Sequence, residues 1–286
     1  MSLSKEQIAR YGRQLILPEI GVQGQEKLLN SSVLIVGAGG LGSPVALYLA
    51  AAGVGRIGIL DNESVALSNL HRQILYTTGD IGQPKSRAAA SRVARINPDA
   101  MVVPIQERLT TGNARSLASS YDLVVDGSDN FPTRYLANDA CVLTNTPLVH
   151  GAAIQFHGQL FTVRPRRSAC VRCVFPEPPT GGAIPNCQEA GVVGPLVGVI
   201  GSLMAHETLK VLVGYGKPLT DRLLIVEGLR GQMREVAVRR DVECAVCGDH
   251  PTIREPSMMH DEGCGNVQKS EEPEVGHQMS EVRTAG

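Results

Sequence analysis

Residues 33–44, VLIVGAGGLGSP, decide the fold class of this chain. Residues 33–36 are an apolar, mostly β-branched run, which is typical of a strand buried on both faces of a parallel sheet. The glycines that follow match G-x-G-x-x-G with one glycine added: Gly37, Gly39, Gly40 and Gly42. Such a turn lets the backbone approach a phosphate, and the helix predicted around Pro44 directs its amino end at that charge. A turn needed only for packing is the alternative interpretation.

A second apolar run, at residues 57–60, ends at Asp61. An acid at the tip of the second strand, about 20 residues past the glycines, binds a ribose hydroxyl in dinucleotide-binding folds. Asp61 followed by Asn62 is also a common surface turn, which is the structural alternative. The whole pattern predicts a nucleotide site, and it is compatible with NAD, FAD or ATP.

Strands and helices alternate along the first 150 residues, which predicts a doubly wound, mostly parallel sheet of the Rossmann-like α/β class. Further predicted helices cover residues 85–96, 113–119, 133–143 and 195–213. Further predicted strands cover residues 101–105, 123–125, 148–149, 159–163, 223–226 and 233–238. The alternating pattern from residue 159 indicates antiparallel strands that extend the sheet. We expect one domain over residues 1–250, followed by a polar, disordered tail at 251–286.

The composition of the 286 residues limits the classes of partner. A net charge of −1 gives no basic surface for nucleic acid or membranes, and aromatic residues at 3% leave few platforms for stacking bases. The amino terminus is polar, has Ser4 and Gln7 placed as a helix capping box, and lacks the apolar segment of a signal peptide. The longest apolar run, residues 192–204, is short and interrupted by Gly and Pro. We expect a cytoplasmic protein that binds neither nucleic acid nor membranes.

Four of the seven cysteines form two C-x-x-C pairs: Cys170 with Cys173, and Cys244 with Cys247. Two such pairs offer the four thiolates that a tetrahedral structural Zn²⁺ site uses. Disulfides are disfavoured in a cytosolic chain, and a redox C-x-x-C fits poorly because neither pair is predicted to lie at a helix start. The pattern predicts a zinc ion that staples the C-terminal strands to the domain and performs no chemistry.

The other three cysteines have different surroundings. Cys141 lies in an apolar helical stretch and is predicted to be a core residue, whereas Cys264 lies in the polar tail and receives no role. Cys187 follows a loop rich in proline and glycine, PEPPTGGAIPN at residues 176–186. A loop cysteine near a nucleotide site is a candidate nucleophile, and a small loop residue without chemistry is the alternative.

Polar residues near the ends of successive strands select the nucleotide. Asn69 and Arg72 follow the second strand, Lys85 opens the next helix, and Asp129 with Asn130 follows the fourth strand. The carboxyl ends of parallel strands meet at one edge of the sheet, so we expect these side chains to converge. Two cations, amides and a carboxylate suit a triphosphate with Mg²⁺, and NAD does not need this many cations. Each of them, taken alone, is also a common solvated surface residue.

These motifs together resemble the ThiF/MoeB/HesA family, the bacterial-type relatives of ubiquitin-activating enzymes. The segments that carry the resemblance are GAGGLG, LSNLHRQ, GQPKS, DNFPTR, GVVGPLVGVIGSLMAHETLK and the two C-x-x-C pairs, all within residues 4–249. The resemblance implies an ATP-dependent adenylyltransferase that activates the C-terminal carboxylate of a small ubiquitin-fold sulfur carrier protein ending in Gly-Gly, similar to ThiS or MoaD. Thiamine, molybdopterin, tRNA thiolation and other sulfur-carrier routes all stay open.

The resemblance also implies roles for individual residues. The ATP contacts would be Gly37, Gly39, Gly40, Gly42, Asp61, Ser68, Asn69, Leu70, His71, Arg72, Lys85, Asp129 and Asn130. Arg72 and Lys85 would act on the phosphates, with Mg²⁺ held by Asp129. The segment RYGRQ resembles the N-terminal motif of the family, so Arg13 would reach the site of a second subunit in a homodimer. Cys187 would take the activated carboxylate as a thioester or join the carrier through an acyl-disulfide.

The chain ends without the rhodanese domain of eukaryotic relatives, so we expect sulfur to come from a separate sulfurtransferase or cysteine desulfurase. Two other classes of function stay open. An NAD-dependent oxidoreductase would share the glycine turn, although the sequence shows no hydride-transfer constellation. A non-catalytic, zinc-stapled binding protein would keep the cysteines and lose the phosphate-site charges, yet Arg72, Lys85 and Asp129 are all present.

Overall fold

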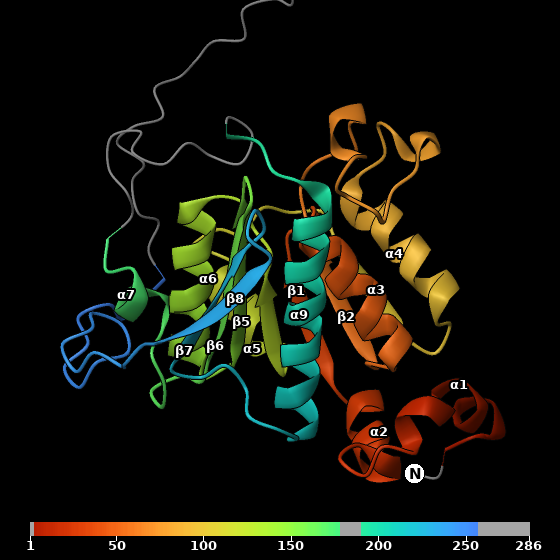
Figure 1. Ribbon diagram of the computed structural model, residues 1–286, viewed down its shortest axis with the longest axis horizontal. Helices are drawn as coiled ribbons and strands as arrows, with labels where there is room; N and C mark the ends of the chain where they lie inside the picture. The colour runs from red at the N-terminus through yellow and green to blue at the C-terminus, as the bar shows by residue number, and fades with distance from the viewer. Residues whose placement is uncertain (1–2, 178–189, 257–286) are drawn as a thin grey trace, which may run out of the picture.

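The computed structural model describes residues 3–177 and 190–256. Within them lies one eight-stranded sheet with the order β3-β2-β1-β4-β5-β6-β7-β8 (Figure 1). Its strands are β1 (Ser32–Val36), β2 (Arg56–Leu60), β3 (Met101–Ile105), β4 (Leu123–Asp126), β5 (Leu148–Ile154), β6 (His157–Val163), β7 (Arg222–Glu227) and β8 (Gln232–Ala237). Strands β3, β2, β1, β4 and β5 pair in parallel, and β5 to β8 pair antiparallel. The predicted α/β fold, a mostly parallel sheet extended by antiparallel strands, is confirmed.

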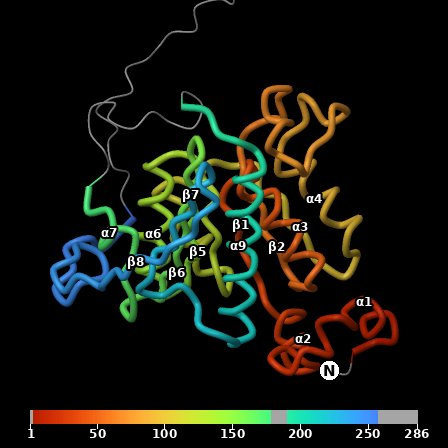
Figure 2. The backbone as a smooth tube through the Cα atoms, viewed as in Figure 1, coloured from red at the N-terminus to blue at the C-terminus, as the bar shows by residue number. Residues whose placement is uncertain are grey.

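Helices cover both faces of the sheet. They are α1 (Lys5–Leu15), α2 (Gly21–Leu29), α3 (Gly42–Ala52), α4 (Lys85–Ile96), α5 (Ala114–Ser119), α6 (Phe131–Thr144), α7 (Val171–Val174) and α9 (Gly194–Val213), with 3₁₀ turns at Leu67–Asn69 and Thr78–Asp80. Val33 and Ile35 of β1 pack in a core cluster with residues of α3 and α9, which run side by side in Figure 2. Leu34 and Val36 pack in a second cluster with residues of α5 and α6. Alternate strand residues point to opposite faces, so a strand covered on both sides is apolar throughout.

The glycine turn lies where the strand order reverses. Strand β1 pairs with β2 on one side and with β4 on the other, and ligands bind outside the carboxyl ends of strands at such a switch point. Gly37 has a φ of 87°, which a side chain would strain. A Cβ atom at Gly42 would overlap the carbonyl oxygen of Gly37. These two positions therefore require glycine before any ligand is considered.

Helix α9 is the one helix among the described residues that is long and apolar enough to cross a membrane. Half of that stretch is buried within the fold, where α9 contacts α3, β5 and β6. Ile200 and Met204 are fully buried in the first core cluster. A helix that is apolar around most of its circumference is typical of a protein core, and burial explains the composition of α9.

Most predicted elements are confirmed with shifts of one or two residues at their ends. Strand β5 is the exception, because it continues to Ile154 and pairs along its whole length with β6. The capping box is confirmed: the Ser4 hydroxyl accepts from the Gln7 amide at 3.1 Å, and the Gln7 side chain accepts from the Ser4 amide at 3.0 Å. Cys141 is fully buried, as predicted for a core residue. Helices α2 and α7 have no counterpart among the predicted elements.

Candidate active site

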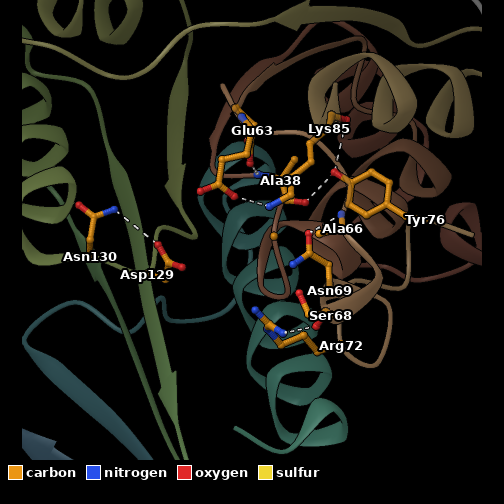
Figure 3. A network of polar contacts seen from close by, with 12 residues as sticks. Ala38, Glu63, Ala66, Ser68, Asn69, Arg72, Tyr76, Lys85, Asp129 and Asn130 are labelled. Atoms are coloured by element: carbon orange, nitrogen blue, oxygen red, sulfur yellow. Dashed lines mark hydrogen bonds and ion pairs between the residues drawn. The ribbon is translucent and has the colours of Figure 1, made fainter. Parts of the chain in front are cut away.

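A cavity of about 170 Å³ lies at the carboxyl ends of β1, β2 and β4. The predicted nucleotide-site residues that line it are Gly37, Gly39, Gly40, Asp61, Asn69, Arg72, Lys85, Asp129 and Asn130. Figure 3 shows Asp129 and Asn130 on one side, and Asn69, Arg72 and Lys85 on the other. The fold thus brings together side chains from the glycine turn, from the segment between β2 and α4, and from the segment between β4 and α6.

Four of the predicted ATP contacts do not line this cavity. Gly42 packs against the backbone of the glycine turn, and Leu70 packs against the first core cluster. Ser68 and His71 lie beside Arg72, whose Nη1 donates to the Ser68 carbonyl at 3.1 Å and lies 2.8 Å from Nε2 of His71 (Figure 3). Ser68 and His71 therefore hold the guanidinium of Arg72 at the cavity wall.

Asp61 is fixed by the backbone on both of its carboxylate oxygens. Oδ2 accepts from the amide of Ala38 in the glycine turn at 2.8 Å, and Oδ1 accepts from the amide of Glu63 at 2.8 Å. Burial raises the pKa of Asp61 above its ordinary value, although these hydrogen bonds and the charge of Lys85 act in the opposite direction. The carboxylate is therefore a rigid acceptor at the tip of β2, in the place where a ribose hydroxyl is expected.

Lys85 is the buried cation of the site. It is the first residue of α4, its backbone amide donates to the carbonyl of Glu63 at 2.8 Å, and its side chain is only 4% exposed. Its ammonium forms an ion pair with the carboxylate of Glu63 at 2.5 Å. Asn69 keeps its place at the cavity through its Oδ1, which accepts from the amide of Ala66 at 3.1 Å. The segment between β2 and α4 is thus held by backbone contacts before any ligand binds.

The opposite wall is built at the end of β4, on a buried carboxylate that was not predicted to matter. Asp126 accepts from the hydroxyl of Ser128 at 2.6 Å and from its amide at 3.0 Å, while its other oxygen lies 2.8 Å from Nδ1 of His150. Both Asp126 and His150 are at most 1% exposed. This pair fixes the turn that presents Asp129, and Asn130 then caps α6 by accepting from the amide of Thr133.

Two buried polar atoms at the cavity lack a protein partner. Among the described residues, three buried side-chain oxygen or nitrogen atoms make no hydrogen bond, and two of them belong to cavity-lining residues: Oε1 of Gln73 and Nε of Arg134. A buried polar group without a partner costs about 1–3 kcal/mol, so native proteins pair such groups with protein, water or ligand. The cavity therefore has hydrogen-bonding capacity that a polar ligand can use.

The two predicted cysteine pairs come together in space. The sulfur atoms of Cys170, Cys173, Cys244 and Cys247 all lie within 4.8 Å of one another. The shortest separations are 3.3 Å between Cys173 and Cys247 and 3.7 Å between Cys170 and Cys244. Tetrahedral Zn²⁺ with Zn–S bonds of about 2.3 Å places its sulfurs about 3.8 Å apart, so the donor set fits this ion.

One argument used against a redox role for these cysteines was wrong. Cys170 is the N-cap of α7, so the first pair does lie at a helix start. The redox interpretation is still weak, because four sulfurs gather at one place and a redox pair needs two. Arg172, between the two cysteines, forms a bidentate ion pair with the buried carboxylate of Asp139 on α6, at 2.8 and 2.7 Å. The cluster is thereby tied to the domain.

Two other predicted residues are not at the cavity. Arg13 is exposed in the last turn of α1 and does not line it, so a role in this chain's own site finds no support. Cys187 lies outside the described residues. Sequence reasoning missed four residues that line the cavity: Glu63, Gln73, Ser128 and Arg134. Glu63 and Ser128 each lie at the end of a predicted strand, and that position is the signal that could have found them.

Comparison with known proteins identifies the family. The ThiF family model matches residues 11–246. A sulfur carrier protein adenylyltransferase of Thermus thermophilus is 54% identical over 260 residues, which cover 89% of this chain and 96% of the relative. The adenylyltransferase and sulfurtransferase MOCS3 of Aedes aegypti is 49% identical over 252 residues, which cover 88% of this chain and 58% of the relative. The chain thus spans little more than half of that longer protein.

Solved structures agree on the fold. The chain resembles E. coli MccB with a TM-score of 0.76 at 23% identity, over 87% of this chain and 74% of that one. A structure of E. coli MccB with ATP gives a TM-score of 0.70 at 24% identity, over 84% of this chain and 74% of that one. Identities this low support a shared fold only. Since the family model covers most of the sequence and the relatives cover nearly the same stretch, the chain belongs to the ThiF family.

Proposed function

We propose that this protein adenylates the C-terminal carboxylate of a small ubiquitin-fold sulfur carrier protein, with ATP as the second substrate. The observation that carries the proposal is the convergence of Asn69, Arg72 and Lys85 with Asp129 around the glycine turn. The name of the Thermus thermophilus relative, a sulfur carrier protein adenylyltransferase, supports the same reaction. Such a carrier would end in Gly-Gly, as in the family that the motifs resemble.

The chemistry asks for positive charge more than for a base. A carboxylate oxygen of the carrier attacks the α-phosphorus of ATP, the bond to the bridging oxygen breaks, and pyrophosphate leaves with the electron pair. The carboxylate is already ionised at neutral pH, so it needs no general base. Negative charge grows on the leaving pyrophosphate, and cations fixed beside it stabilise that charge. Lys85 and Arg72, each held by neighbouring backbone carbonyls, are the cations for this task.

Two metal ions belong to the proposal. Asp129, exposed at the cavity wall, would hold a Mg²⁺ ion that neutralises phosphate charge when bound. The four clustered cysteines would hold a structural Zn²⁺ ion, which supplies no chemistry but joins the segment after β6 to the segment after β8. The closed set of four sulfur ligands leaves no coordination position for a substrate.

The proposal includes partners beyond the carrier. Exposed Arg13 on α1 would complete the site of a second subunit, so the active form would be a homodimer. Sulfur would come from a separate sulfurtransferase or cysteine desulfurase, and the product would serve thiamine, molybdopterin or related synthesis in the cytoplasm. The two alternatives are an NAD-dependent oxidoreductase and a non-catalytic, zinc-stapled binding protein. Titration with ATP against NAD separates the oxidoreductase from the proposed enzyme, because NAD would bind more tightly only to an oxidoreductase.

The deciding experiment is ATP–pyrophosphate exchange with a panel of purified carrier proteins. Lys85→Ala or Arg72→Ala should lower exchange about 10²–10³-fold, the usual loss for one donor to the transition state. Arg95→Ala is the matched control, since Arg95 is exposed at the far end of the helix that Lys85 begins. Exchange with no carrier in the panel would remove the non-catalytic alternative's rival, the enzyme itself. Normal exchange in the Lys85→Ala variant would refute the phosphate-site assignment.

A further inference from the structure

Glu63 is the acidic residue of the cavity that the proposed reaction does not use. It lies two residues beyond Asp61, its side chain is 58% exposed, and it lines the same cavity as Lys85 and Asp129. A carboxylate here is unexpected for a site that receives a polyanion, because it adds repulsion where attraction is needed. Its partner gives the reason for its presence: Oε2 of Glu63 lies 2.5 Å from Nζ of Lys85.

The ammonium of Lys85 needs a counter-charge while no phosphate is bound. Its side chain is 4% exposed, and a buried charge without a partner is costly. The exposed carboxylate of Glu63 supplies that charge from the cavity side (Figure 3). A phosphate oxygen that enters the cavity must share this ammonium with the carboxylate or replace it there.

We infer that Glu63 is a positioning residue that stands in for a phosphate oxygen on Lys85, and that it weakens the binding of ATP and of the pyrophosphate product. The inference rests on the proposed adenylation, which it deepens. Between turnovers the carboxylate keeps Lys85 directed into the cavity. After the reaction it competes with pyrophosphate for the same ammonium, and this competition favours release of the product.

The side-chain charge of Glu63 is separable from the structure of its loop. The backbone of Glu63 is held independently, since its amide donates to Asp61 and its carbonyl accepts from the amide of Lys85. Glu63→Gln therefore removes the charge and keeps an oxygen that can accept from the ammonium. Glu235→Gln is the matched control, because Glu235 also forms an exposed ion pair, with Arg222, on the strands β7 and β8 away from the cavity.

The test measures binding of Mg-pyrophosphate and Mg-ATP to the full chain by calorimetry, together with KM and kcat in pyrophosphate exchange. Glu63→Gln should bind both ligands roughly three- to tenfold more tightly, the scale of one partly screened charge. KM for ATP and the pyrophosphate inhibition constant should fall by the same factor. A residue that only holds the loop would instead leave affinity unchanged or lower it.

The outcomes separate the inference from the proposed function. Tighter binding in Glu63→Gln and unchanged binding in Glu235→Gln support the role of Glu63. Unchanged or weaker binding in Glu63→Gln, with a thermal midpoint equal to that of the wild type, overturns it while exchange by the wild type still supports adenylation. A wild-type protein that binds neither ligand and shows no exchange overturns both.

Discussion

Replacing His150 by leucine should cost more stability than any other single change at the candidate site. His150 on β5 is 1% exposed and lies 2.8 Å from the carboxylate of Asp126 on β4, which is 0% exposed. His150→Leu leaves that carboxylate buried without its partner. Removing one member of a buried ion pair costs about 3–5 kcal/mol, because the remaining charge stays desolvated. At about 2–4 °C per kcal/mol for a domain of this size, the midpoint of thermal unfolding should fall by roughly 6–20 °C.

The pH dependence follows from the direction of the pKa shift of Asp126. Burial opposes its ionisation, but hydrogen bonds from His150 and Ser128 and the charges of His150 and Arg134 outweigh burial and lower the pKa. A lowered carboxyl pKa stabilises the fold above the ordinary value of about 3.9, and that contribution is lost as the pH falls through the folded-state pKa. The difference between wild type and His150→Leu should therefore be full at pH 7 and shrink at acid pH.

Calorimetric unfolding of the zinc-loaded protein at pH 7 is the measurement. His150→Asn is the control, because its amide nitrogen can donate to Asp126 and should recover part of the loss. The leucine variant should also lose pyrophosphate exchange, since Asp126 fixes Ser128 beside Asp129. A leucine variant that unfolds within about 1 kcal/mol of the wild type would refute the reasoning, because the buried carboxylate would then not need its partner.

Three further predictions concern the metal, the knuckle and the assembly. The purified protein should carry about one zinc per chain by elemental analysis, and Cys173→Ser should lower both zinc content and the thermal midpoint; metal-free wild type would contradict this. Arg172→Met should cost about 3–5 kcal/mol in urea unfolding, and adding Asp139→Asn should recover part of it; no recovery would exclude an unpaired carboxylate as the cause. Mixing Arg13→Ala chains with Lys85→Ala chains should restore part of the exchange activity through hybrid sites, and hybrids without activity would count against a shared site.

The parts of the site that sequence predicts are those set by local pattern. The glycine turn follows directly from β1, and Lys85 follows from the helix that it opens. Convergence of Lys85 and Asp129 could also be predicted, because carboxyl ends of parallel strands share one edge. Gathering of the four cysteines follows from the preference of one ion for four thiolates. In each case a short sequence pattern has one physical consequence.

The parts that sequence does not predict depend on strand register and on packing between distant segments. Asp126 and His150 meet because they are register partners on β4 and β5, and the sequence signals neither the register nor the full length of β5. The start of α7 at Cys170 is likewise invisible, since a helix of four residues is too short for periodicity. Whether Arg13 reaches a second subunit depends on an interface that no pattern within one chain encodes.

The charges around the cavity explain why these separate proposals support one another. The cavity is lined by as many carboxylates as cations: Asp61, Glu63, Glu107 and Asp129 against Arg72, Lys85, Arg108 and Arg134. A balanced lining attracts a triphosphate poorly by itself, because each cation already faces a carboxylate charge at short range. Mg²⁺ at Asp129 and Arg13 from a second subunit would each add positive charge, and displacing Glu63 from Lys85 would free a cation already present. The affinity of this site for ATP should therefore depend on metal, on assembly and on Glu63 together.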